Sequence, residues 1–91
     1  MRLDLFLKAS RLCPRRTVAQ KLCDARLVFV NGTLAKSSHS VKAGDEVTIR
    51  RHDRITTVRV RSIPLTRQTS RKEAEDLYEV LKSDRFAIDK L

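Results

Sequence analysis

The stretch RLDLFLKASRLCPRRTVAQKLCDARLVFVNG, residues 2–32, decides the fold of this chain. In its first part Leu3, Phe6 and Leu7 recur at the spacing of one buried helical stripe. A second amphipathic helix is expected to follow, with Pro14 in its first turn, where a missing N–H costs no hydrogen bond. The stretch therefore predicts two short helices with polar outer faces.

The end of the same stretch predicts a change from helix to sheet. After residue 26 the apolar residues alternate, and Asn31-Gly32 is a strong signal for a tight hairpin turn. Alternation then predicts a short strand around Leu34 and strands over residues 46–50 and 55–60. We expect a small antiparallel sheet with arginines at its edge.

A last helix is predicted near the C-terminus. Ser70 is a suitable N-cap, and residues 71–83 carry one apolar helical face. That face consists of Ala74, Leu77, Tyr78 and Leu81. The predicted fold class is therefore α+β, with two N-terminal helices packed on a small antiparallel sheet and a C-terminal helix in addition.

The charge of the chain points to a polyanionic partner. Its 91 residues carry 20 Lys and Arg against 11 Asp and Glu, a net charge of +9, and 41% of them are apolar, too many for a disordered basic tail. Residues 1–26 carry seven basic and two acidic side chains, whereas residues 63–91 carry six of each. This distribution predicts a folded unit that binds nucleic acid through its N-terminal helices.

Catalysis has little support in the sequence. A chain of this length builds a binding surface more easily than an enclosed cavity, and its two glycines form no phosphate-cradling loop. Ser38, His39 and Asp45 are close in the sequence, but nothing orders them as nucleophile, base and orienting acid. We expect no catalytic residue, metal site or cofactor.

Two further features concern the cell compartment. Cys13 and Cys23 are too few for a disulfide framework and are expected to be small, reduced, packed side chains. No apolar run approaches the roughly 20 residues that span a bilayer, and the charges of Arg2 and Asp4 argue against a signal peptide. We therefore expect a cytoplasmic protein with no membrane partner.

The candidate phosphate contacts are basic residues of the two N-terminal helices. Five of them are expected to lie along one ridge where the helices meet: Lys8, Arg11, Arg15, Arg16 and Lys21. Arg2 lies at the exposed start of the first helix, where it can pair with Asp4 on the same polar face. The alternative is that some of these side chains are only solvated charges.

A second group of polar residues lies in the predicted sheet region. Lys36, Ser38 and Lys42 flank the loop after the hairpin and are expected to extend the same surface. Residues 50–54 contain three arginines, among them Arg51, and permit two interpretations. They form a phosphate-binding arm at a hairpin tip, or a charged edge strand that prevents aggregation between sheets.

Taken together, these residues resemble the S4 RNA-binding domain, the module named after the fourth protein of the small ribosomal subunit. Five pieces of its pattern occur in order and in register: Arg2-Leu3-Asp4, Leu7, Arg16 with Ala19 and Leu22, VFVNG at residues 28–32, and GDEV at residues 44–47. The resemblance implies an S4 domain over residues 1–62. A connector and C-terminal helix over residues 63–91 are expected to pack on or beside it.

Two positions depart from the S4 pattern. The family usually has Ser where this chain has Arg15, which adds a charge to the second helix. It commonly has Gly near Arg26, where that helix turns into the strand. Arg26 therefore either adopts a strained φ angle, or the turn is built differently.

The resemblance extends to short bacterial proteins of the RqcP and Hsp15 type. It is carried by AKSSHSVKAGDE, residues 35–46, and by KEAEDLYEVL, residues 72–81. It implies binding to the ribosomal RNA and tRNA of large subunits blocked by peptidyl-tRNA, where the tRNA is held in place during ribosome-associated quality control. The implied protein partner is a tailing factor that extends the nascent chain, and the protein itself is expected to be a monomer.

Two alternatives stay open at this point. The first is a general RNA chaperone or translational regulator that uses the same module on a different RNA. The second belongs to another class, a protein-interaction adaptor that works through the C-terminal helix, whose charge is balanced. Residue spacing and charge by themselves lead only to structured RNA as the partner.

Overall fold

The computed structural model of the protein describes residues 1–51, 54–65 and 69–85. Over these residues the elements follow in the order α1 (Leu3–Ala9), α2 (Arg16–Asp24), β1 (Val28–Val30), β2 (Thr33–Leu34), β3 (Glu46–Arg51), β4 (Arg54–Val60), α3 (Arg71–Asp76) and β5 (Tyr78–Arg85). The strands form one antiparallel sheet in the order β2-β1-β3-β4-β5. Residues 66–68 and 86–91 of the predicted C-terminal unit lie outside the described part.

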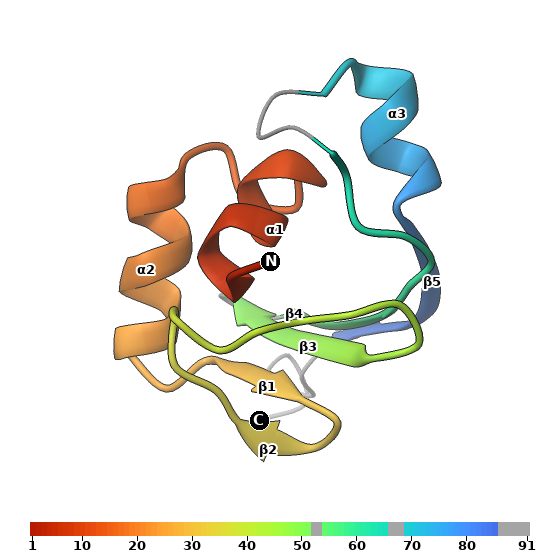
Figure 1. Ribbon diagram of the computed structural model, residues 1–91. Helices are drawn as coiled ribbons and strands as arrows, with labels where there is room; N and C mark the ends of the chain where they lie inside the picture. The colour runs from red at the N-terminus through yellow and green to blue at the C-terminus, as the bar shows by residue number, and fades with distance from the viewer. Residues whose placement is uncertain (52–53, 66–68, 86–91) are drawn as a thin grey trace.

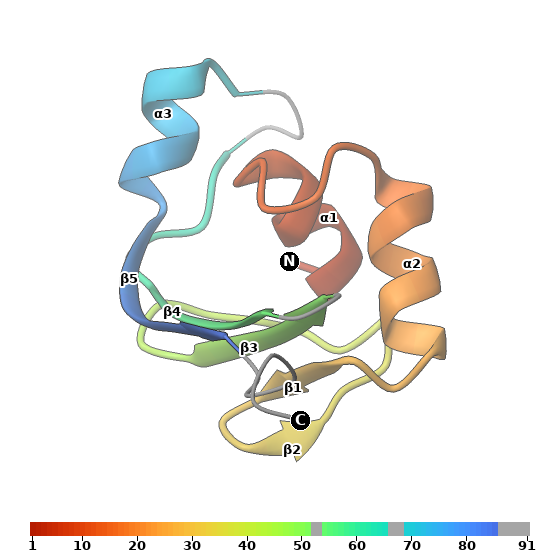
Figure 2. The same ribbon diagram turned by 180° about the vertical axis from the view of Figure 1, so that it is seen from behind.

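Helices α1 and α2 form a layer over one face of the sheet (Figure 1). They lie side by side, and α3 stands on the far side of α1 from α2, a relation that both views show (Figure 2). The chain between β4 and α3 passes the end of α1, where the Thr69 hydroxyl donates a hydrogen bond to the Ala9 carbonyl. The predicted α+β fold class, with two N-terminal helices on an antiparallel sheet, is confirmed.

The core lies between this helical layer and the sheet. Leu3, Phe6 and Leu7 of α1 are fully buried, so the predicted apolar stripe of the first helix is confirmed. Their counterparts on the sheet are the alternate residues Val28, Val30, Val47, Ile49, Val58 and Val60, all buried. Because successive strand residues face opposite sides, this alternation turns one face of the sheet toward the helices.

The Asn31-Gly32 turn joins β1 to β2, as predicted. Both residues have positive φ angles, 52° and 82°, as in the two-residue turns whose twist fits an antiparallel hairpin. Asn31 also fastens the turn to the start of β3, since its side-chain oxygen accepts from the Glu46 N–H at 2.9 Å. Its amide group donates to the Asp45 carboxylate at 3.2 Å. One residue therefore shapes the hairpin and fixes the neighbouring strand.

At the end of α2, Arg26 adopts the strained φ angle that was one of the two expected alternatives. Arg26 follows the helix with φ of 64°, the left-handed conformation that glycine adopts most easily. Its N–H donates to the Cys23 carbonyl, and the Leu27 N–H reaches back to the Leu22 carbonyl, both at 3.0 Å. These two bonds are those of a Schellman motif, which satisfies the last carbonyls of a helix. The turn is the ordinary one for this position, made with a strained arginine.

The C-terminal helix is shorter than the sequence predicts. It begins at the predicted cap, where the Ser70 side chain accepts from the Glu73 N–H and the Ser70 N–H donates to the Glu73 carboxylate. It ends at Asp76, however, and the expected helix over residues 77–83 is wrong. Residues 78–85 instead form β5.

The sheet explains this change of structure. Without β5, strand β4 would present a row of unpaired N–H and C=O groups, whereas β5 pairs with it from Val60↔Tyr78 to Arg54↔Arg85. Tyr78 and Val80 alternate along a strand and have high strand propensity. Tyr78 also belongs to the predicted helical face, so this stretch is compatible with either structure. A tertiary partner decided between them, since short helices are marginal without packing.

The start of α2 is also displaced from its prediction. Pro14 lies in the connection before the helix and not in its first turn, which begins at Arg16 after an extended Arg15. The connection is held against α1 because Cys13 is fully buried and its N–H donates to the Leu7 carbonyl at 3.0 Å. Among the described residues, no helix is both long and apolar enough to cross a membrane.

Replacing Arg26 by glycine should stabilise the protein. The left-handed conformation costs a residue with a Cβ roughly 1–2 kcal/mol, and glycine removes this cost. Glycine also increases the conformational entropy of the unfolded chain, which lowers stability by about 0.5–1 kcal/mol. We expect Arg26→Gly to raise the free energy of unfolding in urea by about 0.5–1 kcal/mol. Ala25→Gly is the matched control, because Ala25 has φ of −79° and should lose stability instead. A loss in both variants would contradict the strain at Arg26.

Candidate nucleic-acid interface

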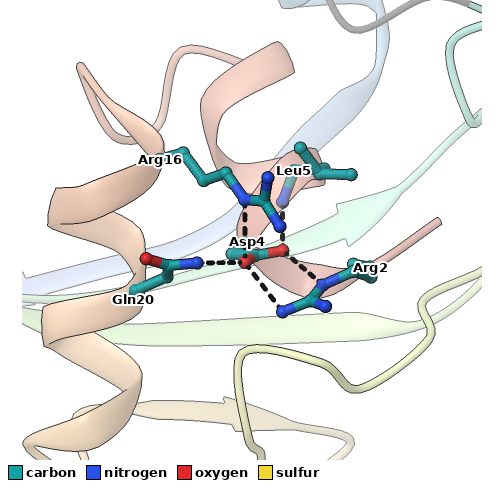
Figure 3. A network of polar contacts seen from close by, with 5 residues as sticks. All are labelled: Arg2, Asp4, Leu5, Arg16 and Gln20. Atoms are coloured by element: carbon teal, nitrogen blue, oxygen red, sulfur yellow. Dashed lines mark hydrogen bonds and ion pairs between the residues drawn. The ribbon is translucent and has the colours of Figure 1, made fainter.

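A buried carboxylate lies between the two N-terminal helices. Asp4 of α1 is 0% exposed, and donors from three parts of the chain surround it (Figure 3). Arg2 binds both carboxylate oxygens through Nε and Nη2, each at 3.2 Å. Arg16 Nε and Gln20 Nε2, both from α2, reach Oδ2 at 3.1 and 2.9 Å. The Leu5 N–H completes the set by donating to Oδ1 at 2.8 Å.

The local structure brings these donors together. Arg16 and Gln20 are four residues apart, so they lie one above the other on the side of α2 that faces α1. Arg2 precedes α1 in an extended conformation, which lets its side chain fold back over Asp4. The α1 start is itself held by the loop at residues 37–40, whose Ser37 and His39 carbonyls accept from the first helical N–H groups.

The environment keeps Asp4 ionised. Burial raises the pKa of its carboxyl group, but hydrogen bonds from Gln20, Arg2 and Arg16 and the positive charge of Arg16 outweigh that effect. The pKa of Asp4 therefore lies below its ordinary value of 3.8. A buried charge of this kind is stable only while its partners remain in place.

The sequence interpretation of Asp4 needs a correction. The predicted pair with Arg2 is present, but Asp4 does not lie on a solvated face, because α2 covers it. Gln20 was not singled out from the sequence, although it donates the shortest side-chain bond to Asp4. The signal available was its spacing of four residues from Arg16, which places both on one helical stripe.

Asp4 fixes two of the predicted cations at the surface. The side chains of Arg2 and Arg16 remain 44% and 38% exposed while they bind the carboxylate. Two guanidinium groups share one carboxylate, so the cluster keeps a positive charge toward solvent. Arg16 uses only Nε for this contact, and its terminal amino groups have no hydrogen-bond partner among the described residues. Held in this way, an arginine loses little further entropy when it binds a phosphate.

The other helical cations do not share this cluster. Lys8 lies one turn after Asp4 on α1 and is partly exposed, and Arg15 is exposed just before α2. Lys21 is exposed too, but it comes five residues after Arg16 and so points away from the α1 side of the helix. The five predicted residues therefore spread around the helix pair and do not form one straight ridge.

Arg11 has a structural task at the end of α1. Its φ of 62° makes it the left-handed residue after that helix, and its N–H donates to the Lys8 carbonyl at 3.0 Å. Its guanidinium group donates to the Thr69 carbonyl at 2.9 Å. Arg11 thus ties the N-terminal helices to the segment that leads into α3.

The predicted residues of the sheet region lie in three places. Lys36 and Ser38 are exposed and line a groove of about 450 Å³ together with Arg26, at the end of α2. Lys42 is exposed at a turn, where its N–H donates to the Asp45 carboxylate at 3.0 Å. Arg51 lies at the end of β3 and lines a separate hollow with Leu12.

Both cysteines are buried thiols. Burial raises the pKa of the Cys13 thiol, and burial with the nearby carboxylate of Asp4 raises that of Cys23 to about 11. Thiols with such pKa values are protonated near neutral pH and are poor nucleophiles. Their packing in the core agrees with the small, reduced side chains that the sequence predicts.

The helical pair and the first strands form a module whose fold occurs in known proteins. The S4 domain family model matches residues 1–47 of this chain. The chain therefore belongs to the S4 domain family.

Curated relatives match it over nearly its whole length. The "RQC P-site tRNA stabilizing factor" of Bacillus subtilis (strain 168) is 44% identical over 86 residues, which cover 94% of this chain and 98% of the relative. The factor of the same name from Halalkalibacterium halodurans is 46% identical over 85 residues, which cover 92% and 93%.

Solved structures show the same fold. The trimeric structure of Vibrio cholerae Heat Shock Protein 15 has a TM-score of 0.79 at 34% identity and covers 88% of this chain and 80% of that one. The solution structure of the hypothetical protein HP1423 has the same TM-score at 32% identity, with 90% and 98% covered. The predicted resemblance to the S4 domain and to the Hsp15 type is confirmed.

Removing the charge of Asp4 should destabilise the protein in a pH-dependent way. Asp4→Asn leaves the half-exposed Arg2 and Arg16 without their anion and buries an amide N–H₂ group among hydrogen-bond donors. A buried polar group left unsatisfied costs about 1–3 kcal/mol. Folding lowers the pKa of Asp4. The stabilisation that its charge gives is therefore complete at pH values above its ordinary pKa of 3.8, and it is lost as the pH falls through the pKa of the folded state. The free energy of unfolding measured in urea should therefore differ strongly between wild type and variant at pH 7, and only slightly in strong acid.

Asp84→Asn is the matched control for this comparison. Asp84 is 57% exposed and, among the described residues, pairs only with Lys82 at the surface, so its loss should change the unfolding free energy by less than about 1 kcal/mol. A gap between wild type and Asp4→Asn that stays constant from pH 7 to strong acid would show that packing, and not charge, explains the effect.

Proposed function

We propose that this protein is a non-enzymatic factor that binds ribosomal RNA and tRNA on the large ribosomal subunit. In this proposal it stabilises peptidyl-tRNA on stalled or obstructed subunits during ribosome-associated quality control, while a tailing factor on the same subunit extends the nascent chain. The observation that carries the proposal is the match to P-site tRNA stabilizing factors over more than nine tenths of the chain. We propose that it acts as a monomer in the cytoplasm.

The chemistry of the surface supports a partner with a folded phosphate backbone. Arginines that a buried carboxylate holds in fixed positions suit phosphate oxygens, which accept two parallel hydrogen bonds from one guanidinium group. Aromatic residues make up only 4% of the chain, so base stacking of the kind used on single strands has little support. Recognition of helical RNA by its shape, through phosphates and 2′-hydroxyl groups, fits this composition better.

The residues proposed to contact RNA are those that the sequence indicates. They are Arg2, Lys8, Arg11, Arg15, Arg16, Lys21, Lys36, Ser38, Lys42 and Arg51. The contacts of these residues divide them into two groups. Arg2, Arg11 and Arg16 also hold the fold together, whereas the other seven, Lys8 and Arg15 among them, make no side-chain hydrogen bond or ion pair to another described residue. Variants of the second group therefore report on binding with little cost in stability.

Binding to defined ribosomal particles tests the proposed function. We expect the protein to pellet with purified large subunits that carry peptidyl-tRNA, and to do so several-fold more strongly than with vacant large subunits. Equal binding to both particles and to free ribosomal RNA would favour the alternative of a general RNA chaperone. Absence of binding to any of the three would overturn the proposal.

The contribution of the exposed helical cations is measurable by salt dependence. Replacing Arg15 by glutamine should reduce the slope of log affinity against log salt by roughly 0.7–0.9, the share of one phosphate, on a fixed RNA hairpin. Arg61→Gln is the matched control, since Arg61 is exposed on another part of the surface and pairs with Glu79 at 3.5 Å. Equal slopes for Arg15→Gln and wild type would remove Arg15 from the interface.

The adaptor alternative requires a different experiment from a simple truncation. Deleting residues 71–91 would remove β5 and expose the edge of β4, so a loss of binding would report on folding. Glu75→Lys changes the exposed surface of α3 and leaves the cap formed by Ser70 and Glu73 intact. An adaptor that works through α3 should lose its protein partner in this variant, whereas an RNA-binding factor should keep its affinity for RNA.

A further inference from the structure

The arginines after β3 face each other across a hairpin. Arg51 of β3 and Arg54 of β4 are directly opposite in the antiparallel register. Both line a hollow of about 200 Å³, together with Thr56, Ile49 and Leu12. Leu12 belongs to the connection between α1 and α2, so the hollow opens between that connection and the end of the hairpin. Residues 52 and 53 lie outside the described part of the chain.

Strand geometry places this pair on the helix side of the sheet. Ile49 is 5% exposed and faces the helices, and Arg51 comes two residues later on the same face. Arg54 and Thr56 share that face because they pair with Arg51 and Ile49. Arg50 points to the opposite face. The three arginines of residues 50–54 therefore serve two different surfaces.

The topology removes one of the two interpretations of these arginines. A charged edge strand would need β3 or β4 to lie at the border of the sheet. Both strands lie inside the order β2-β1-β3-β4-β5, and β5 pairs with β4 as far as Arg54. The expectation of a protected edge at this hairpin is therefore wrong. Another reason must explain two cations in register.

The charges of the pair are unbalanced within the described residues. Like charges directly opposite each other destabilise a hairpin, and among residues 1–51, 54–65 and 69–85 neither arginine has an ion-pair partner. Arg59, on the same strand as Arg54, pairs with both Glu46 and Glu79 at 3.5 and 3.7 Å. Arg54 is instead oriented by a neutral partner, since its Nη1 donates to the Ser83 hydroxyl at 3.3 Å. Within the described residues, the lining of the hollow thus carries two positive charges and no negative one.

We propose that this hollow is a second phosphate site for the RNA backbone, separate from the Asp4 cluster. A phosphate between Arg51 and Arg54 would receive hydrogen bonds from both guanidinium groups and replace their repulsion by attraction. The Thr56 hydroxyl is a further donor, and Leu12 and Ile49 give an apolar wall suited to a ribose. The site is reached from the α1–α2 connection, whereas Arg2 lies at the start of α1. This inference rests on the proposed function in so far as the ligand is RNA.

Salt dependence of RNA binding tests the site. We expect Arg51→Gln with Arg54→Gln to reduce the slope of log affinity against log salt by roughly 1.4–1.8 on a fixed RNA hairpin, the share of two cations. The matched control is Arg59→Gln with Arg61→Gln, which removes two arginines that pair with carboxylates on the same sheet and should leave the slope nearly unchanged. Equal reductions in both double variants would show a general charge effect and overturn the site.

The same measurement separates this inference from the proposed function. If the wild-type protein binds no RNA, the proposed function fails. If it binds RNA and the Arg51→Gln, Arg54→Gln variant keeps the wild-type slope, only the second site fails. Should that variant not fold, titration of the wild-type protein with inorganic pyrophosphate replaces it. The Nε–H signals of Arg51 and Arg54 should then shift in NMR spectra while that of Arg59 does not, and unchanged signals at both arginines would overturn the site.

Discussion

The burial of one carboxylate constrains the N-terminal half of this protein. An ionised group with no exposed surface is tolerated only when donors occupy its oxygens, and Asp4 obtains five hydrogen bonds. Two of them come from α2 and two from Arg2, so the distance and rotation between the helices are coupled to the position of the first residues. The same contacts hold Arg2 and Arg16 at the surface. Stability and the presentation of positive charge therefore depend on one interaction.

Two other arginines take part in the backbone of the module. Arg11 and Arg26 each follow a helix with a positive φ angle, where glycine is the usual residue. The free-energy cost of the left-handed conformation, roughly 1–2 kcal/mol, is smaller than the unfolding free energy of about 5–15 kcal/mol that is usual for a small domain. Arg11 partly offsets it by binding the Thr69 carbonyl, which joins the helical pair to the chain before α3. Arg26 and Lys36 line one groove. The Arg26 side chain adds a positive charge there, which a glycine at this position would not provide.

The S4 module and the rest of the chain contribute differently to the surface charge and to the packing of the sheet. The family match ends at residue 47, within β3, and the sheet continues through β4 and β5. The later strands complete the sheet over which the helices pack, and their exposed ion pairs among Arg59, Arg61, Glu46 and Glu79 leave little net charge on that side. Among the described residues, the excess of cations over carboxylates is thus found at α1, α2 and the end of the β3–β4 hairpin, where an RNA backbone is proposed to bind.

The sequence alone determined the elements whose signals are local. Helical spacing of Leu3, Phe6 and Leu7, the Asn31-Gly32 turn, the alternation along β3 and β4, and the cap at Ser70 all act within a few residues, so they predict α1, the hairpin, the sheet and the start of α3. The tertiary structure decided the rest. Residues 78–81 are compatible with both a helical and a strand period, and pairing with the edge of β4 favours the strand. Asp4 finds its α2 partners 12 and 16 residues away, and Arg51 and Leu12 line one hollow although they are far apart in the sequence. Contacts between distant segments leave no periodic trace in a sequence, since they depend on how the elements pack.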